Sequence, residues 1–173
     1  DTSGNFTATA NVTAYSDERL KKNWRPVQEG FVEKLAQVKS GVYDRTDIEA
    51  TQAGVSAQDM QKLLAETVQT GEDGTLSLAY GNAALVAAIE LAKQVVELKK
   101  EIELLKLFIE NENKVISRDE ILDRLWGKDQ FPTARTIDNY ILAFRKLFEQ
   151  DPKNPNYFHS IRGVGYKFTP VSL

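Results

Sequence analysis

One apolar stripe in the middle of the chain restricts the possible folds more than any other feature. Between residues 85 and 109, apolar residues recur at alternating steps of three and four positions. This stripe, called the seam below, consists of Ala88, Leu91, Val95, Leu98, Ile102, Leu105 and Ile109. Apolar residues every 3.5 positions are typical of a left-handed coiled coil. The seam therefore predicts a long coiled-coil helix over 85–109; the alternative is an amphipathic helix buried in a single core.

Length and composition limit the class of protein. The 173 residues suffice for one large domain or two small ones, and the charged fraction of 27% is ordinary for a globular protein. No apolar run approaches the length of a membrane span, and the polar N-terminus resembles no secretory signal. Because the chain has no Cys and only His159, we expect no disulfide, no metal and no cofactor.

Charge is distributed unevenly along the chain. Residues 1–98 carry 9 basic and 14 acidic side chains, whereas residues 99–173 carry 13 basic and 11 acidic ones. A polyanion would therefore meet the C-terminal part more readily than the N-terminal part, although a net charge of +2 is weak evidence by itself.

The first half of the chain predicts short strands mixed with helices. Residues 5–15 alternate apolar and polar side chains, as does the run 76–80, so both are predicted to be strands. A short strand is predicted at Val42-Tyr43, and a helix over 57–68 has Met60, Leu63, Leu64 and Val68 on its apolar face. The sequence Gly-Glu-Asp-Gly at 71–74 indicates a turn before the second strand.

Several motifs in this half occur in an order that resembles a known family. They are SDERLKKN, GVY, GVSAQDMQKLLAE and SLAYG, followed by the long helix. In this order they resemble the C-terminal intramolecular chaperone of phage tail fibres and tailspikes, the endosialidase chaperone or S74-type autoprotease, over about residues 5–105. One departure is Ala65, where the family often has Pro.

The resemblance implies a domain layout and a function. Residues 1–15 would end an upstream fibre β-region, and residues 16–98 would form the chaperone and autoprotease domain. Such a domain forms a homotrimer, assists the folding of the upstream fibre segment, and then cuts itself free at the start of SDERLK. The implied location is the cytoplasm of a bacterial host cell during phage assembly.

The residues at the implied cleavage site can carry the chemistry. A hydroxyl nucleophile needs a base that takes its proton and a carbonyl that it can attack. Ser16 follows the Tyr15 carbonyl directly, and the resemblance assigns Lys21 as the partner of Ser16 at a scissile Tyr15–Ser16 bond. Without the resemblance, the same residues predict an ordinary helix start, with Ser16 or Asp17 as the N-cap.

From Lys99 onward the pattern changes to helices followed by a hairpin. Ser117 and Glu120 form a capping-box pattern before a helix that Gly127 ends. A second helix over 133–148, which Thr133 would cap, would turn Ile137, Ile141, Phe144, Leu147 and Phe148 inward. Two short alternating runs flank the sequence Arg-Gly-Val-Gly at 162–165, which predicts a β-hairpin.

This layout and its residues resemble a second family. The motifs ISRDEILDRLWG, RTIDNYILAFRKLFE and IRGVGYKF resemble the winged-helix DNA-binding domain of OmpR/PhoB-type response regulators, over about residues 100–170. In that family one helix lies in the major groove of double-stranded DNA, and the wing reaches the minor groove. The implied contacts are Arg135, Thr136 and Arg145 with phosphates, Asn139 and Tyr140 with base edges, and Arg162 with the minor groove.

Two departures from this second family weaken the DNA-binding prediction. Ala143 stands where the family commonly has a basic residue, and neither a four-stranded sheet nor a receiver domain precedes the helix. A solvated helix face is the alternative interpretation of Arg135 and Arg145.

Together these patterns predict an α+β chain with a mixed chaperone module, a coiled-coil helix and a winged-helix module at 99–173. The modules join inside one helix, and the chain does not begin with Met, so an engineered fusion or an excised piece is one interpretation and a natural chain the other. The main functional hypothesis is a self-cleaving, trimeric fibre chaperone joined to a DNA-binding module. The alternatives are an oligomeric DNA-binding transcription-regulator module with a chaperone-like assembly scaffold, and a scaffold with neither activity.

Overall fold

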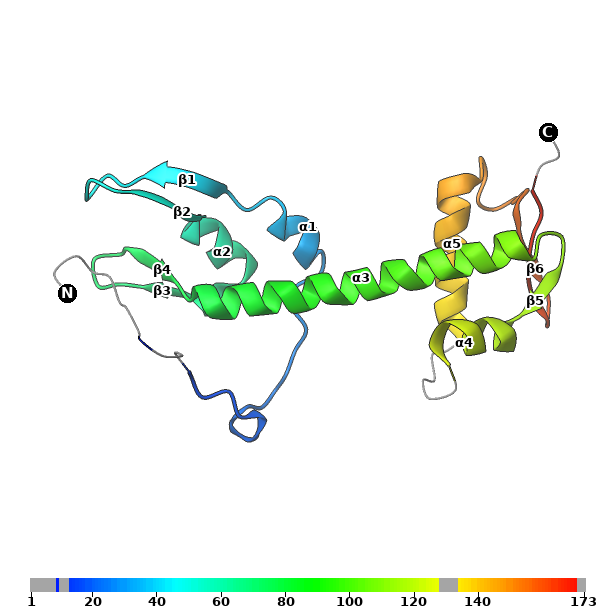
Figure 1. Ribbon diagram of the computed structural model, residues 1–173, viewed down its shortest axis with the longest axis horizontal. Coiled ribbons are helices and arrows are strands. Elements are labelled where there is room, and N and C mark those ends of the chain that lie inside the picture. The colour runs from blue at the N-terminus through cyan, green and yellow to red at the C-terminus, as the bar shows by residue number, and fades with distance from the viewer. Residues whose placement is uncertain (1–8, 10–12, 128–133, 171–173) are drawn as a thin grey trace. The chain divides into compact units, whose positions relative to one another are not determined.

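The computed structural model describes residues 9, 13–127 and 134–170, which divide into two compact units (Figure 1). The first unit comprises residues 1–83 and the second residues 84–173. This boundary falls within the long helix α3, Tyr80–Glu110. The helix also runs without a break past residues 98 and 99, where the sequence predicted the two modules to join. Among the described residues, no helix has the length and apolarity that crossing a membrane requires.

The first unit consists of short elements arranged around two antiparallel hairpins. In chain order these are η1 (Glu18–Leu20), α1 (Phe31–Leu35), β1 (Ser40–Asp44), β2 (Thr51–Val55), α2 (Ala57–Leu63), η2 (Ala65–Thr67), β3 (Val68–Thr70) and β4 (Leu76–Leu78), before α3 begins. Strand β1 pairs with β2, and β3 pairs with β4. The buried apolar side chains of this unit are Phe31, Met60, Leu63 and Ala83.

Two predictions for the first unit need correction. The predicted helix over 57–68 ends at Leu63, because Val68–Thr70 pairs with Leu76–Leu78 across the 71–74 turn and forms a strand instead. Residues 5–8 and 10–12 of the predicted N-terminal strand lie outside the described residues, and residues 13–15 form no strand. Strand β2 was not predicted, since its sequence TQAGV has little apolar alternation.

The second unit contains three helices and a three-stranded sheet. After α3 come β5 (Val115–Ser117), α4 (Arg118–Trp126), α5 (Ala134–Phe148), β6 (Phe158–Ile161) and β7 (Gly165–Phe168), with strand order β5-β7-β6. This is a winged-helix-like arrangement, as predicted. Its core consists of Leu104, Leu107, Phe108, Ile116, Ile121, Ile137, Tyr140, Ile141, Phe144, Phe158 and Tyr166.

Local sequence signals explain where several of these elements begin and end. The Ser117 hydroxyl accepts a hydrogen bond from the Glu120 backbone N–H at 3.1 Å, so Ser117 caps α4 as predicted. Gly163 takes a φ of 74° in the β6–β7 turn. A Cβ on Gly165 would lie 1.9 Å from the Ile116 carbonyl oxygen, so β7 approaches β5 closely because this residue is Gly. The expected cap Thr133 lies outside the described residues.

The inward face of α5 differs from the predicted one. Ile137, Ile141 and Phe144 are buried as expected, but Leu147 is 75% exposed and Phe148 half exposed. Tyr140 is buried in their place. Positions 137, 140, 141 and 144 share one side of the helix, whereas 147 and 148 lie at its last turn. Phe148 still contacts the core at its edge, with its ring centroid 6.0 Å from that of Phe158.

Candidate functional sites

Helix α5 has a second face that is exposed along its whole length. Arg135, Asn139, Leu142 and Lys146 follow one another at helical spacing and are all exposed; they are called the α5 stripe below. They lie on the side of the helix opposite the buried Ile137 and Phe144. Two cations and one amide on an exposed helix face match the residue types that contact phosphates and base edges in nucleic acids.

The structure places two of the residues expected at DNA away from the α5 stripe. Tyr140 is only 6% exposed, so its ring faces the core and not base edges, which corrects that expectation. Arg145 is half-buried; its Nε donates to the Phe158 carbonyl at 2.9 Å and its Nη2 to the Ser160 hydroxyl at 2.9 Å. The Arg145 side chain therefore fastens α5 to β6. Thr136 is half-buried beside the stripe.

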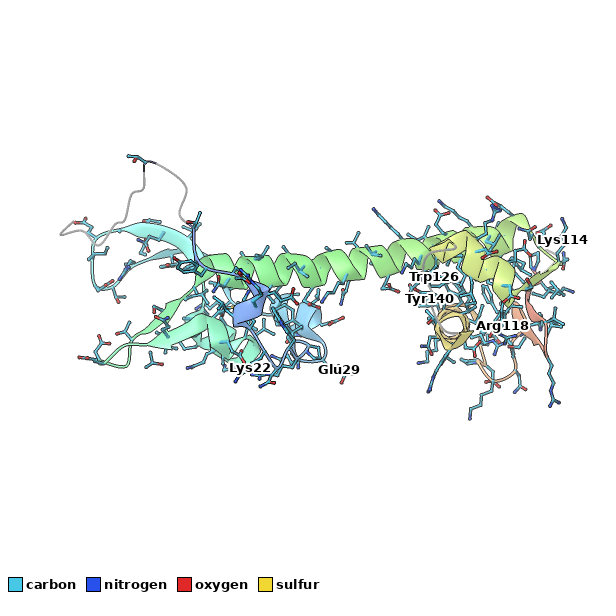
Figure 2. All side chains as sticks on the ribbon, turned by 90° about the horizontal axis from the view of Figure 1, so that it is seen from below. Lys22, Glu29, Lys114, Arg118, Trp126 and Tyr140 are labelled. Carbon is cyan, nitrogen blue, oxygen red and sulfur yellow. The ribbon has the colours of Figure 1, made fainter. Side chains whose placement is uncertain are left out.

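Tyr140 belongs to a contact between α5 and α3 that the sequence did not indicate. Its hydroxyl donates to the Glu97 carboxylate at 2.5 Å, and its ring stacks on Trp126 with centroids 5.9 Å apart. The Lys100 ammonium lies 5.2 Å from the Trp126 ring centroid (Figure 2 labels Trp126 and Tyr140). Burial, helped by the nearby Glu97, raises the pKa of Tyr140, and the same hydrogen bond lowers the pKa of Glu97.

The hairpin that corresponds to a wing is held to the helices by a polar cluster. Arg118 Nη2 lies 3.1 Å from the Tyr166 hydroxyl, which donates to Asp138, and the guanidinium stacks over the Tyr166 ring at 4.8 Å. This cluster joins α4, α5 and β7. Arg162, at the exposed tip of the same hairpin, remains accessible to a ligand.

A buried carboxylate orders the connection from α5 to β6. Glu149 accepts hydrogen bonds from the backbone N–H groups of Asn156, Tyr157 and Phe158 at 2.8–2.9 Å. Burial works to raise the pKa of Glu149, but the three N–H donors outweigh it and hold that pKa below its usual value. Sequence reasoning missed this residue, because a single Glu after a helix carries no signal that distinguishes it from a surface residue.

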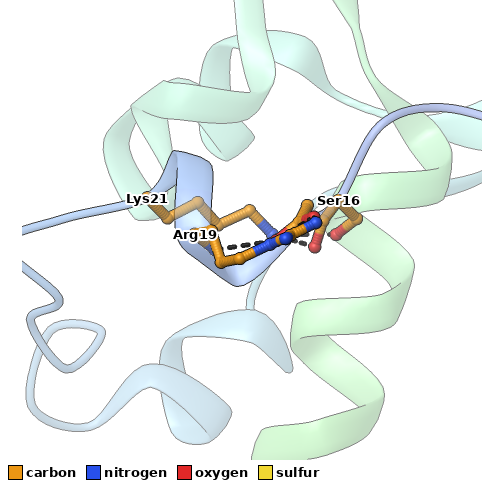
Figure 3. Close-up of polar contacts among 4 residues, drawn as sticks. Ser16, Arg19 and Lys21 are labelled. Atoms are coloured by element: carbon orange, nitrogen blue, oxygen red, sulfur yellow. Dashed lines mark hydrogen bonds and ion pairs between the residues drawn. The ribbon is translucent and has the colours of Figure 1, made fainter.

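In the first unit, the structure brings together the two residues expected to act in self-cleavage. Lys21 Nζ donates to Ser16 Oγ at 2.8 Å and to the Ser16 carbonyl oxygen at 3.0 Å (Figure 3). Between them η1 turns the chain back, because the Asp17 side chain caps its first turn through the Arg19 backbone N–H at 2.8 Å. Ser16, Lys21 and Tyr15 are exposed in this single chain.

Asp17 and Arg19 pair beside this site. Arg19 Nε donates to Asp17 Oδ1 at 3.0 Å and Arg19 Nη2 donates to Asp17 Oδ2 at 2.5 Å, and these hydrogen bonds lower the pKa of Asp17. The pair is exposed and lies in the turn that brings the Lys21 side chain back to Ser16.

Comparison with known proteins divides the chain as the motifs do. Residues 93–168 match the family described as "Transcriptional regulatory protein, C terminal", and residues 16–69 match "Chaperone of endosialidase". Both resemblances expected from the sequence are thereby confirmed.

Several of the similar curated proteins are described as transcriptional regulatory proteins. They include YvrH of Bacillus subtilis, 38% identical over 69 residues (40% of this chain and 29% of YvrH), and SphR of Synechococcus elongatus, 41% identical over 68 residues (39% of this chain and 26% of SphR). The chain thus spans less than a third of the length of these two relatives.

One solved structure is also similar to part of this chain. The OmpR/PhoB homologue DrrB of Thermotoga maritima shares 40% identity, covering 42% of this chain and 32% of DrrB, with a TM-score of 0.39. By the family matches, residues 93–168 are similar to the C-terminal region of transcriptional regulatory proteins, and residues 16–69 are similar to the chaperone of endosialidase.

Proposed function

We propose that this chain is an oligomeric DNA-binding module of the transcription-regulator type, in which the first unit and the seam of α3 assemble copies of the chain. The α5 stripe would meet the major groove, and Arg162 at the hairpin tip would meet the minor groove. The observation that carries this proposal is the exposure of Arg135, Asn139 and Lys146 on one face of α5, within the segment that matches the regulator family.

The contacts around α5 support this role. Arg118, Tyr166 and Arg145 fix the hairpin and β6 to the helices, so the stripe and the hairpin tip belong to one rigid surface. A binding surface on rigid elements loses less conformational entropy when it meets its ligand. Asn139 remains the residue proposed for base edges, and Arg135 and Thr136 the residues proposed for phosphates.

Binding of a labelled DNA duplex, followed by fluorescence anisotropy, tests the proposal. Arg135→Ala and Arg162→Ala should each weaken binding about tenfold at low salt, because each removes one cationic contact. Lys93→Ala is a matched control: it removes an exposed cation of α3 that pairs with Glu90 at 2.6 Å, outside the proposed surface. Equal losses in all three variants would point to unspecific charge attraction, and no binding by the parent chain would refute the proposal.

The contact between Ser16 and Lys21 favours a second candidate function, self-cleavage at the Tyr15–Ser16 bond. Ser16 Oγ would attack the Tyr15 carbonyl carbon while Lys21, in its neutral form, takes the hydroxyl proton and passes it to the departing Ser16 nitrogen. Water would then hydrolyse the resulting ester, leaving a Tyr15 carboxylate and a free Ser16 hydroxyl. The upstream segment, a fibre segment according to the resemblance, would be released.

Assembly would control this second activity. A lysine acts as a base only when it is neutral, and burial favours the neutral form. Lys21 is exposed in the single chain, so coverage by a neighbouring copy in the proposed homotrimer would be needed. The intact mass of freshly expressed protein tests this. A fragment 16–173 from the parent, absent from Ser16→Ala and Lys21→Ala, is expected; uncut parent protein would contradict self-cleavage.

A further inference from the structure

Helix α3 presents two different faces over the same turns. Leu104 and Phe108 are fully buried in the core of the second unit, whereas Leu98, Ile102 and Ile109 of the seam are 55%, 53% and 55% exposed. At 3.6 residues per turn, the seam is centred about 140° around the helix from the buried face. Most of the apolar seam therefore stays uncovered where α3 also serves as a core helix of the second unit; Leu105 is the exception, since it is half-buried and packs against that core.

A second copy of this chain is the occupant that fits the seam. The seam has the spacing of a coiled coil, in which the apolar seams of two or more helices pack against one another. This spacing continues without interruption from Ala88 to Ile109. One pair of charges beside the seam would be complementary across a parallel pair of helices. Glu101 precedes Lys106 by five positions, the offset at which flanking residues of neighbouring parallel helices meet.

Helix α5 lies against the side of α3 that the seam does not occupy. Glu97 and Lys100 of α3 contact Tyr140 and Trp126, and α5 is seen nearly end-on beside α3 in Figure 2. The α5 stripe is on the far side of α5 from Tyr140 and Phe144, which face the core. The stripe therefore points away from α3, and so away from the seam.

From this geometry we propose that one assembly binds more than one DNA duplex at a time and bridges them. Parallel pairing along the seam sets the second units at the same level around the coiled coil, with each α5 stripe facing outward. Duplex DNA is stiff, with a persistence length of about 150 base pairs, so one duplex cannot wrap a coiled coil to reach two such surfaces. This inference rests on the DNA-binding function proposed above.

A two-duplex capture experiment with the full chain tests the inference. One duplex is biotinylated and held on streptavidin beads, and a second duplex of the same sequence is fluorescent and free. The parent chain should retain the fluorescent duplex on the beads. The double variant Ile102→Lys with Ile109→Lys should lower retention about tenfold or more, because separated copies lose multivalency, while single-duplex anisotropy changes by no more than about twofold.

Matched controls separate loss of assembly from loss of folding. Val96→Lys adds a lysine at a position of α3 that is similarly exposed, 49%, but lies off the seam, so it should leave retention unchanged. If the double variant loses its helical circular dichroism, Leu91→Lys with Leu98→Lys takes its place, since these residues precede the buried Leu104.

The outcomes distinguish the two proposals. Single-duplex binding without capture of the second duplex by the parent would overturn bridging and leave the proposed DNA binding intact. Undiminished capture by a seam variant that sediments as a single chain would also overturn bridging through the seam. Absence of any anisotropy change with the parent would overturn both.

Discussion

The two units differ in how much apolar surface each buries by itself. In the second unit, Leu104, Phe108, Ile121 and Ile137 are fully buried, and Phe158 packs its ring against Phe108, Phe144 and Phe168. In the described part of the first unit, the buried apolar side chains form only a small group, and every residue of β1 is exposed, including Val42 at 75%.

This difference fits the proposed function, in which the second unit has a core of its own and the first unit would be stabilised by assembly with other copies. A two-stranded antiparallel sheet is marginally stable at best in water unless something covers one of its faces. Strands β1 and β2 form such a sheet, and its exposed apolar residues need a partner surface. We infer that other copies of the chain supply it. The predictions below test this contrast, from the largest expected effect to the smallest.

Truncation in the core of the second unit should have the largest effect. Phe108→Ala should lower the free energy of unfolding by about 3–5 kcal/mol, since it empties a fully buried site. Ile109→Ala, on the exposed seam, is the neighbouring control and should cost about 1 kcal/mol or less within a single chain. Urea unfolding followed by Trp126 fluorescence in a Trp24→Phe background measures both; equal costs would contradict a self-contained core.

Loss of the buried Glu149 carboxylate should cause the second largest loss of stability. Glu149→Gln should destabilise the second unit by about 2 kcal/mol, because a charged acceptor of three N–H bonds becomes a neutral one. The folded pKa of Glu149 is lowered, so its contribution is fully present above the unfolded pKa of about 4.3 and is lost as pH falls through the folded value. Urea unfolding at several pH values should therefore show parent and variant converging in acid.

The contact between α5 and α3 should contribute less. Tyr140→Phe removes the hydrogen bond to Glu97 and keeps the stacking on Trp126, so it should cost about 1 kcal/mol. Duplex affinity should not change, because Tyr140 is buried. A selective loss of DNA affinity without loss of stability would restore Tyr140 as a base-contacting residue.

Dilution should produce the smallest effect and should separate the two units. If other copies cover the first unit, amide hydrogen exchange in β1 should become faster on dilution. Each tenfold dilution should lower the free energy of protection by about 1 kcal/mol. Exchange in α5 should respond less, since its protection comes from the core of its own unit. An equal change of exchange rate in β1 and α5 on dilution would contradict the proposal that only the first unit depends on other copies.

Sequence predicted the second unit better than the first, for physical reasons. Ser117, the seam and the Arg-Gly hairpin are local signals, and a strongly periodic helix or a capped start needs no knowledge of distant residues. The end of α2 and the existence of β2 depend on pairing with other strands, which a short polar sequence does not reveal.

The candidate sites divide in the same way. The contact between Ser16 and Lys21 lies within one turn of chain and was anticipated. The inward position of Tyr140 and the fastening role of Arg145 depend on partners 43 and 13 residues away, so a position in a motif could not reveal them. Glu97 and Glu149 escaped notice for the same reason.

The salt dependence of duplex binding tests the central claim most directly. If Arg135 at a phosphate and Arg162 in the minor groove both neutralise charge on the duplex, the logarithm of the parent's binding constant should fall linearly with the logarithm of salt concentration, with a slope of about −0.9 per neutralised phosphate. Each alanine variant should make that slope shallower by about one, whereas Lys93→Ala should not. A slope that is the same for the parent and both arginine variants would contradict DNA binding through α5 and the hairpin tip.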